Sequence, residues 1–308
     1  MTSRVDQSSP GYWVRSIIAG GFAGGVAKTA VAPLDRVKIL FQTHNQDYVR
    51  FIGSWRGIPG ALKEIFRNEG FFGLYRGHSL TLARAVPHAA IGYTAYEASR
   101  RFVIRSPEQD TPLRRMITGS MAGVSALPFT YPFEVIRVRM ALQTRLLPPE
   151  QRSVWYAIRS IYTEPSALPL RILHFYRGFA VSMLGTIPYR GGIFMVWETL
   201  KSQSRQHLSE EFRERNRHRL NLSIGAIAGA TAQIVTYPLE VIRRNQQASR
   251  STQENRRFLG FKETVSLIWK GAGWRGFYSG LGVGLIKQVP MHSISLAAWQ
   301  AAKQILNI

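Results

Sequence analysis

Three segments of the chain repeat one pattern of charged side chains, in which an acid and a base stand three residues apart behind a proline. The segments are residues 33–38, 132–137 and 238–243, and the charged residues are Asp35, Lys38, Glu134, Arg137, Glu240 and Arg243. Residues three apart share one face of a helix. Because a proline inside a helix kinks it, three such helices can converge at one end. The pattern therefore predicts that charged groups of neighbouring helices meet in a ring.

The ring pairs the acid of one segment with the base of another. We expect Asp35 to pair with Arg137, Glu134 with Arg243, and Glu240 with Lys38. At an effective dielectric constant of about 20, each pair is worth a few kcal/mol. Pairs of that strength hold one end of a helix bundle shut and can still open, so the spacing predicts a gate.

Two further markers recur with the same period as these segments. Tyr75, Tyr176 and Tyr278 each stand two residues before a glycine, and a second proline set comprises Pro87, Pro188 and Pro290. Three independent markers with a common period of about 100 residues indicate a threefold internal repeat. We place the repeats at about 12–105, 111–206 and 218–305, within a single domain that spans residues 1–308.

Each repeat shows the same order of apolar and amphipathic stretches. A stretch rich in Gly and Ala leads into the proline motif, at residues 17–40, 116–140 and 222–242. A short segment follows in which apolar residues such as Ile58, Leu62 and Ile65 share one helical face. A second long stretch ends in an aromatic residue, Glu or Gln, and a base. The order predicts an all-α protein with six long and three short helices.

Small residues in the long stretches favour a membrane location for the bundle. No uninterrupted run of about 18–20 apolar residues exists, so hydropathy alone does not identify a membrane protein. However, small residues stand four apart at 20/24, 21/25, 119/123 and 225/229, which lets helices approach closely in lipid. Helices of mixed polarity fit spans that line a wet cavity. We therefore expect six transmembrane helices.

Composition narrows the functional classes. The 308 residues include 40 Lys and Arg against 18 Asp and Glu, a net charge of +22, and no cysteine. Disulfides, thiolate metal sites and cysteine nucleophiles are thereby excluded. The charge indicates an anionic partner, which could be nucleic acid, an acidic membrane surface or a phosphorylated small molecule.

Two segments bear on targeting and on membrane contact, the N-terminus and one charged run. The first ten residues lack an apolar or Arg-rich amphipathic stretch, so we expect no cleavable presequence. A basic run could meet anionic head groups through Arg213, Arg215, Arg217 and Arg219. Acidic residues in the same run (Glu210, Glu211 and Glu214) favour a solvated linker instead.

On these motifs the sequence resembles the mitochondrial carrier family (solute carrier family 25) from about residue 13 to residue 303. The family signature continues from the proline motif to acid-Gly, then four residues, then aromatic-base-Gly. The first repeat nearly completes it with Glu69-Gly70 and Tyr75-Arg76-Gly77. The second repeat has Glu164-Pro165, and the third has Ala272-Gly273 and Tyr278-Ser279-Gly280. These departures concern loop geometry and leave the expected fold unchanged.

The resemblance implies a multi-pass transporter of the inner mitochondrial membrane that works by alternating access. Its three pseudosymmetric repeats would each carry a short amphipathic matrix helix, and both termini would face the intermembrane space. We expect a monomer that is not an enzyme, has no cofactor or metal, and contacts anionic lipids such as cardiolipin. In this family glutamines brace the ion pairs, which implies that role for Gln42 and Gln247; from spacing alone, exposed helix positions are an equal alternative.

A second gate is implied at the cytosolic end, made by the charged residues that close each repeat. Its pairs would be Glu97 with Lys201, Glu198 with Lys303, and Gln300 with Arg100. Because Gln300 is neutral, its contact is weaker than an ion pair. A weaker cytosolic gate favours a resting state that is open to the cytosol.

Substrate choice in the family is attributed to positions about one turn before the second proline set. Here these are Arg84, Gly185 and Lys287, with Thr186 and Gln288 alongside; Lys28 and Arg190 add positive charge. This set suits a phosphorylated ligand with a flat group against Gly185. Arginine within a membrane span is costly, so a functional use of Arg84 and Arg190 is the default, and snorkelling to an interface is the alternative.

The motif at residues 27–38 with 42–45, and the pair Gly185-Thr186, most resemble the mitochondrial coenzyme A carriers. The expected function is coenzyme A transport in exchange for an adenine nucleotide such as adenosine 3′,5′-bisphosphate or ADP. The alternative substrates are ADP or ATP-Mg and phosphate. A basic nucleic-acid-binding protein is a different-class alternative, but the cations recur beside acids and no nucleic-acid motif is present. An enzyme is disfavoured because no nucleophile with its base and no metal-ligand cluster stands out.

Overall fold

The computed structural model describes residues 10–54, 56–106, 109–143, 153–164, 170–248 and 259–306. Residues 1–9, on which most of the presequence expectation rests, and Pro165 lie outside these ranges. Every secondary-structure element of the described residues is a helix, and these residues contain no strand. The predicted all-α fold is confirmed.

Six long spans form the bundle. Five are single helices: α1 (Pro10–Gln42), α3 (His78–Val103), α4 (Pro112–Ala141), α6 (Phe179–His207) and α8 (Arg217–Ala248). The sixth consists of α10 (Leu281–Ile286) and α11 (Gln288–Leu306). Three of the stretches (residues 15–42, 171–207 and 219–248) are long and apolar enough to cross a membrane. The charges that interrupt the apolar runs explain why the other spans are less apolar.

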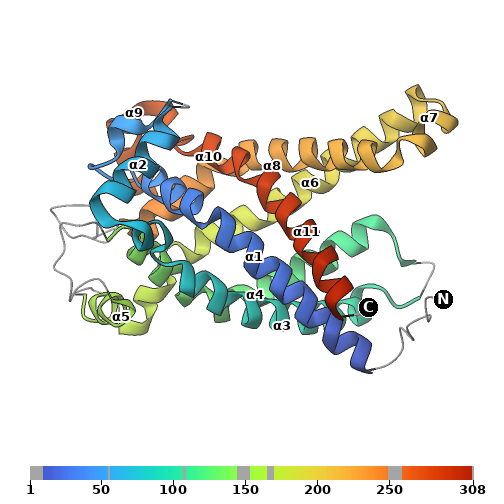
Figure 1. Cartoon of the computed structure of the whole chain (residues 1–308), viewed down its shortest axis with the longest axis horizontal. Coiled ribbons are helices and arrows are strands. Elements are labelled where there is room, and N and C mark those ends of the chain that lie inside the picture. Colours follow the sequence, from blue (N-terminus) through green and yellow to red (C-terminus); the bar gives the residue numbers. More distant parts are fainter. Residues whose placement is uncertain are drawn as a thin grey trace.

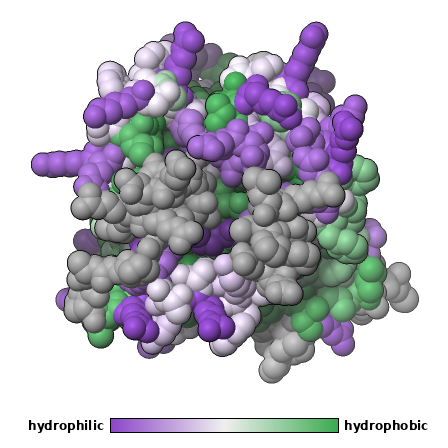
Figure 2. Space-filling view, turned by 90° about the vertical axis from the view of Figure 1, so that its left-hand side faces the viewer, coloured by the Kyte–Doolittle hydropathy of each residue, from purple (hydrophilic) through white to green (hydrophobic). Residues whose placement is uncertain are grey.

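Short helices gather at one end of the bundle. These are α2 (Gly57–Glu69), α5 (Val154–Tyr162) and α9 (Phe261–Gly276), with the 3₁₀ turns η1 (Val49–Phe51), η2 (Phe71–Tyr75) and η5 (Arg171–Tyr176) nearby. They lie at the left of Figure 1, whereas both chain termini lie at the right. Seen from the short-helix end, hydrophilic side chains project around the rim of the molecule (Figure 2).

Prolines lie inside the long helices, as the sequence predicts. Pro33 lies within α1, Pro132 within α4 and Pro238 within α8. A proline in a helix interior removes one backbone hydrogen bond and bends the helix. In Figure 1, α1 and α6 cross the bundle obliquely, whereas α8 runs close to its long axis.

The repeats pack side by side in a closed ring. The most extensive helix contacts join different repeats: α3 with α4, α6 with α8, and α1 with α11. The last of these joins the two ends of the chain, where Arg15 Nη1 lies 3.4 Å from the backbone oxygen of Leu306. No repeat therefore stands alone, because each buries its second long helix against the next repeat.

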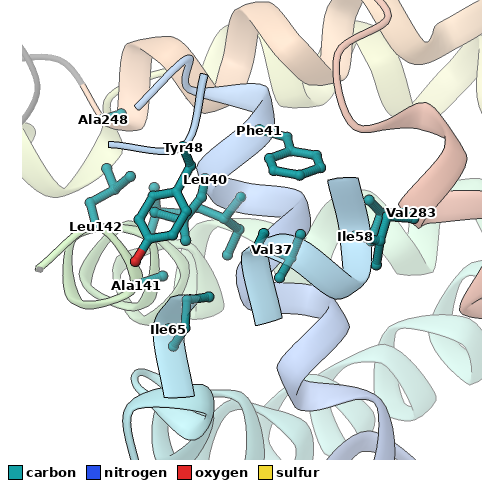
Figure 3. Packing of buried hydrophobic residues seen from close by; sticks show 13 residues of the cluster. Val37, Leu40, Phe41, Tyr48, Ile58, Ile65, Ala141, Leu142, Ala248 and Val283 are labelled. Carbon is teal, nitrogen blue, oxygen red and sulfur yellow. The ribbon is translucent and has the colours of Figure 1, made fainter. Parts of the chain in front are cut away.

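The buried core concentrates where the short helices meet the ends of the long ones. One cluster joins α1, α2 and α4 through residues such as Leu40, Ile65 and Leu142 (Figure 3). Tyr48 belongs to this cluster, and its burial raises the pKa of its hydroxyl group to about 12. Two further clusters repeat the arrangement around Tyr131 and Tyr237. The core thus holds the three long helices together at the end where their charged motifs lie.

A glycine with positive φ starts the second long helix of each repeat. Gly77, Gly178 and Gly280 have φ of 83°, 75° and 82°. A Cβ atom built on Gly77 would lie 2.9 Å from the carbonyl oxygen of Arg137. On Gly178 and Gly280 the corresponding distances to the carbonyl oxygens of Arg243 and Lys38 are 3.2 and 3.3 Å. Glycine is therefore needed both for the turn and for the close approach to the charged motif of another repeat.

The expected solvated linker before the third repeat is wrong in part. Residues Glu210–Arg215 form a short helix, α7, whose first turn is capped by Ser209, and α8 begins at Arg217. Ser209 is a favourable N-cap, and the acids Glu210 and Glu211 stabilise the positive end of the helix. The charge pattern that suggested a linker is therefore that of an exposed helix.

Candidate functional site

The three charged motifs meet where α1, α4 and α8 converge. Arg137 Nη2 lies 2.8 Å from Asp35 Oδ2, and Lys38 Nζ lies 2.8 Å from Glu240 Oε1. Arg243 forms an ion pair with Glu134. The structure thus brings together the residues that the spacing pairs, and they close the bundle at the short-helix end.

Additional cations enter this ring from the second long helices. Lys287 Nζ lies 2.5 Å from Asp35 Oδ1, and Arg84 Nη1 lies 3.0 Å from Glu134 Oε2. Arg84 and Lys287 were expected to bind substrate, and here both contact the carboxylates of the ring. The spacing of the sequence does not reveal this, because it depends on how α3 and α10 lean over the neighbouring helices.

Glu134 collects the most positive charge. Besides Arg243 and Arg84 it accepts a bond from Arg244, whose Nη1 lies 2.9 Å from Glu134 Oε1. Glu134 is 2% exposed, so these cations offset the cost of burying its carboxylate. Arg244 directly follows the motif base of the third repeat and was not identified from the sequence.

The two glutamines after the motifs are buried, which excludes the alternative that they are exposed helix positions. Gln42 Nε2 donates to Tyr237 Oη at 3.0 Å, and Gln247 Nε2 donates to Tyr131 Oη at 2.9 Å. Gln247 Oε1 also accepts a bond from Arg244 at 2.8 Å. Each glutamine therefore links two repeats beneath the ring.

The two tyrosines were missed by the sequence reasoning. Each stands directly before a motif proline, and its hydroxyl donates onward to the backbone of the following loop: Tyr131 to Arg177, and Tyr237 to Ser279. The ring of Tyr131 also lies 5.6 Å from the guanidinium carbon of Arg243. An aromatic residue before the proline in two of three repeats is the signal that could have found them.

Buried arginine–glutamate clusters reinforce the seam between the first and second repeats. Glu69 accepts a hydrogen bond from Arg36 at 2.8 Å and forms an ion pair with Arg76 at 3.0 Å. The Arg36 side chain also donates to the carbonyl oxygens of Ala141 and Gln143, at the end of α4, at 3.2 and 3.1 Å. Both Arg36 and Glu69 side chains are 1% exposed. We call this group the first clamp.

A second clamp joins the second and third repeats in the same way. Glu164 pairs with Arg139 at 3.0 Å and with Arg177, and Arg139 Nε donates to the carbonyl oxygen of Gln247 at 2.9 Å. The glutamate of the unusual Glu164-Pro165 sequence thus occupies the position of Glu69 in the first clamp. The departure from the family pattern did not remove the acid's contacts.

Ion pairs of the ring, Lys38–Glu240 and Lys287–Asp35, cross the third seam, between the third and first repeats. Outside the ring, neutral groups hold this seam among the residues that the structure describes. Asn245 Nδ2 donates to the carbonyl oxygen of Gln42 at 2.8 Å, and Ser279 Oγ lies 3.0 Å from His44 Nε2. Burial lowers the pKa of His44, so the imidazole is held in its neutral form. Ala272 and Ser279 replace the acid and the base of the other repeats, which explains the absence of a clamp.

Two of the expected substrate cations remain free. Within the described chain, Lys28 and Arg190 have no ion pair or hydrogen bond to another residue. A Cβ atom on Gly123 would lie 2.7 Å from an Arg190 guanidinium nitrogen, so this side chain lies across α4. Lys28 lies two turns before Asp35 on α1. These cations therefore lie nearer the chain termini than the ring does.

Of the neutral residues of the expected site, Gln288 and Gly185 face α8, and Thr186 bonds within its own helix, α6. Gln288 Nε2 donates to Gln233 on α8, and Thr186 Oγ1 donates to the Ser182 carbonyl oxygen at 2.7 Å. A Cβ atom on Gly185 would lie 3.7 Å from the Leu239 side chain. Gln233 and Leu239 were not identified from the sequence.

The expected second gate is unpaired at the other end. None of its six residues forms an ion pair with another in the structure described, and Lys303 Nζ instead lies 5.5 Å from the ring centre of Trp299. The residues are Glu97, Arg100, Glu198, Lys201, Gln300 and Lys303. The structure therefore combines a closed ring at the short-helix end with an unpaired set at the terminal end.

A closed ring of inter-repeat ion pairs on six long helices, with unpaired cations on one side of it, defines a membrane transporter. The family described as "Mitochondrial carrier protein" matches residues 9–107, 108–208 and 216–308. The chain belongs to the mitochondrial carrier family.

Several proteins are similar along nearly the whole chain. "Mitochondrial carrier protein CoAc2" of Zea mays is 37% identical, over 96% of this chain and 87% of its own length. "Solute carrier family 25 member 16" of Homo sapiens is 33% identical, over 96% and 90%. "Mitochondrial adenine nucleotide transporter ADNT1" of Arabidopsis thaliana is 33% identical, over 96% and 87%.

Proposed function

We propose that this carrier transports coenzyme A in exchange for an adenine nucleotide such as ADP or adenosine 3′,5′-bisphosphate. The observation that carries the proposal is a set of four cations above and within the closed ring: Lys28, Arg84, Arg190 and Lys287. Two are free, and two contact carboxylates of the ring. Such a set suits a ligand with several phosphate groups, and coenzyme A and adenine nucleotides have this chemistry.

The position of Gly185 favours a ligand that carries a flat group. Without a side chain it leaves space beside Leu239, against which an adenine ring can pack. The names of the relatives from maize and Arabidopsis agree with a nucleotide-like substrate. Lys28 and Arg190 would bind the phosphates first, because their charges are not engaged elsewhere.

Substrate binding would then act on the ring itself. A phosphate that draws Lys287 from Asp35 and Arg84 from Glu134 replaces two contacts of the ring by contacts to the ligand. The carboxylates lose neighbours that stabilise their charge, so the ring is weakened when substrate is present. This couples substrate binding to opening at the short-helix end.

Uptake into proteoliposomes tests the substrate. The purified full chain is reconstituted with internal ADP, and labelled coenzyme A, ADP, ATP-Mg and phosphate are each added outside. We expect coenzyme A uptake that depends on internal adenine nucleotide. Exchange of ATP-Mg for phosphate with no coenzyme A uptake would contradict the proposal and support the alternative substrates.

We also propose that the chain crosses the inner mitochondrial membrane with both termini toward the intermembrane space. Their common location at one end of the bundle supports a shared side. Protease added to mitoplasts should remove a tag fused to either terminus and leave α5, where Trp155 is 72% exposed, uncut until the membrane is opened. Cleavage at α5 in sealed mitoplasts would contradict the proposed orientation and indicate the opposite one.

A further inference from the structure

A cavity of about 530 Å³ lies where α6, α7 and α8 meet, near the end of the bundle that carries the termini. Its walls are mainly apolar and include Leu200, Leu220, Ile224 and Ile227. Small-molecule sites have volumes of roughly 300–1,000 Å³, so the cavity is large enough for a ligand. We call it the α7 groove.

The α7 groove opens away from the transport pathway. Each residue of an α-helix turns by about 100°. On α6, Leu200 and His207 of the groove therefore lie on the side opposite Glu198 of the expected second gate. On α8, Leu220 and Ile224 lie opposite Glu240 of the ring. The groove thus faces outward, toward lipid in a membrane-embedded carrier.

Apolar residues that line the groove are open to the outside of the bundle. Ile227 is 51% exposed and Phe212 is 48% exposed. Such residues need an apolar environment, and acyl chains supply it on the outside of a transmembrane bundle. The wall of the groove is therefore suited to hydrocarbon.

The groove is basic on the side where α8 begins. Arg219 and His207 line it, and no Asp or Glu does so among the described residues. Arg219 is exposed and forms no ion pair in the part of the chain that the structure describes. The positive end of the α8 dipole adds to its charge, because α8 begins two residues earlier.

We propose that the α7 groove binds an anionic phospholipid from the membrane leaflet at the terminal end of the bundle. The phosphate group contacts Arg219, His207 donates a hydrogen bond, and one acyl chain lies along Leu220, Ile224 and Ile227. A free phosphate would leave the apolar walls unused. A zwitterionic phospholipid offers the same phosphate group to Arg219, but it also places a quaternary ammonium group beside that arginine, which repels it. Only an anionic amphiphile matches both parts.

Native mass spectrometry of the full chain in detergent tests this site. Phosphatidylglycerol or phosphatidylcholine with identical acyl chains is added at equal mole ratio, and retained lipid is counted. We expect stronger retention of phosphatidylglycerol. Arg219→Gln should lower that retention about fivefold, the typical effect of one basic residue near an anionic surface. Ile227→Trp should lower retention of both lipids by filling the groove.

Arg217→Gln is the matched control, since it removes the same charge from α8 at an exposed position that does not line the groove. It should retain phosphatidylglycerol like the unmodified chain. Equal losses in Arg217→Gln and Arg219→Gln, equal retention of both lipids by the unmodified chain, or no change in either groove variant would overturn the proposal. Because Arg219 and Ile227 are exposed, unchanged melting temperatures in lipid-free detergent should show that the variants are folded.

Discussion

Arg84 and Lys287 hold two positions in the proposed transport cycle, on the ring carboxylates when substrate is absent and on substrate phosphates when it is bound. Arg84 Nη1 lies 3.0 Å from Glu134 Oε2 and Lys287 Nζ lies 2.5 Å from Asp35 Oδ1, so both cations form ion pairs in the structure. Removing either one therefore has two separable effects, a change in the empty carrier and a loss of ligand binding.

We expect Arg84→Gln and Lys287→Gln each to weaken coenzyme A binding by tenfold or more, because a charge-assisted contact is worth about 1.5–3 kcal/mol. The measurement is the rise in melting temperature on adding coenzyme A, taken relative to each empty variant. Arg101→Gln removes an exposed cation from the same helix, α3, and should leave the rise unchanged. A normal rise in both variants would place the phosphates elsewhere.

Lys38 and Glu240 form the ring pair that is simplest to exchange, because Asp35 and Glu134 each contact more than one cation. Lys38→Glu or Glu240→Lys should reduce transport at least tenfold, since each places like charges together in a buried site. The double exchange restores an attractive pair and should recover part of the uptake in proteoliposomes. Uptake in the double variant no higher than in the single variants would contradict this pairing.

At the scale of helices, the three seams between repeats differ in chemistry. Two contain a buried glutamate between arginines, and the third contains Asn245, His44 and Ser279. The threefold backbone symmetry therefore conceals a chemical asymmetry. Outside the ring, in which Lys38 and Glu240 pair, neutral contacts hold the seam between α8 and α1 among the described residues.

Glu69→Gln should destabilise the carrier more than Asn245→Ala. The first leaves the 1% exposed Arg36 without its counter-charge, which typically costs about 3–5 kcal/mol. The second removes hydrogen bonds to two carbonyl oxygens and should cost about 1–3 kcal/mol. Apparent melting temperatures in detergent compare the two, and a larger loss for Asn245→Ala would show that the clamps are not the stronger seams.

The sequence predicted the helices and the ring more completely than their surroundings. An acid and a base three residues apart are visible in each repeat, and the common period shows that the three motifs occupy equivalent positions. Arg36 also lies in such a repeat, but its partner Glu69 is brought to it only by the path of α2, which no spacing specifies. In the same way α7 was missed because six residues are too few for a periodic pattern to emerge.

At the scale of the whole molecule, the structure combines a paired ring with an unpaired terminal gate. Gln300 is the neutral member of that gate and stands where an acid would complete the third pair with Arg100. A missing charge at one end lowers the stability of the state in which that end is closed. Gln300 therefore affects the equilibrium between two states of the carrier, one closed at the short-helix end and one closed at the terminal end.

Gln300→Glu should shift that balance toward closure at the terminal end. A surface ion pair is worth about 0.2–1 kcal/mol, so we expect up to about a fivefold change in population. The chain has no cysteine, and a Cβ atom on Gly24 would meet nothing within 4 Å. Gly24→Cys, one turn from Lys28 on the same face of α1, can therefore report access through its rate of reaction with a maleimide.

Gln300→Lys in the same Gly24→Cys background is the matched control, because it changes the charge in the opposite sense. It should keep the cysteine at least as reactive as the parent does. A slower reaction in both variants would attribute the change to the substitution itself and contradict a charge-based balance.

The contact of α1 with α11 has a consequence for how the protein is made. A ribosome completes α1 first and α11 last, yet Arg15 meets Leu306 and Lys38 meets the turn at Gly280. Contacts between such distant parts of a chain form late and slowly. During synthesis, Asp35 therefore lacks its ion pair with Lys287 until the third repeat has been made. A premature stop codon, even in the last helix, would remove the contact of α11 with α1 and leave the ring of repeats open. We therefore expect such alleles to give no carrier with partial transport activity.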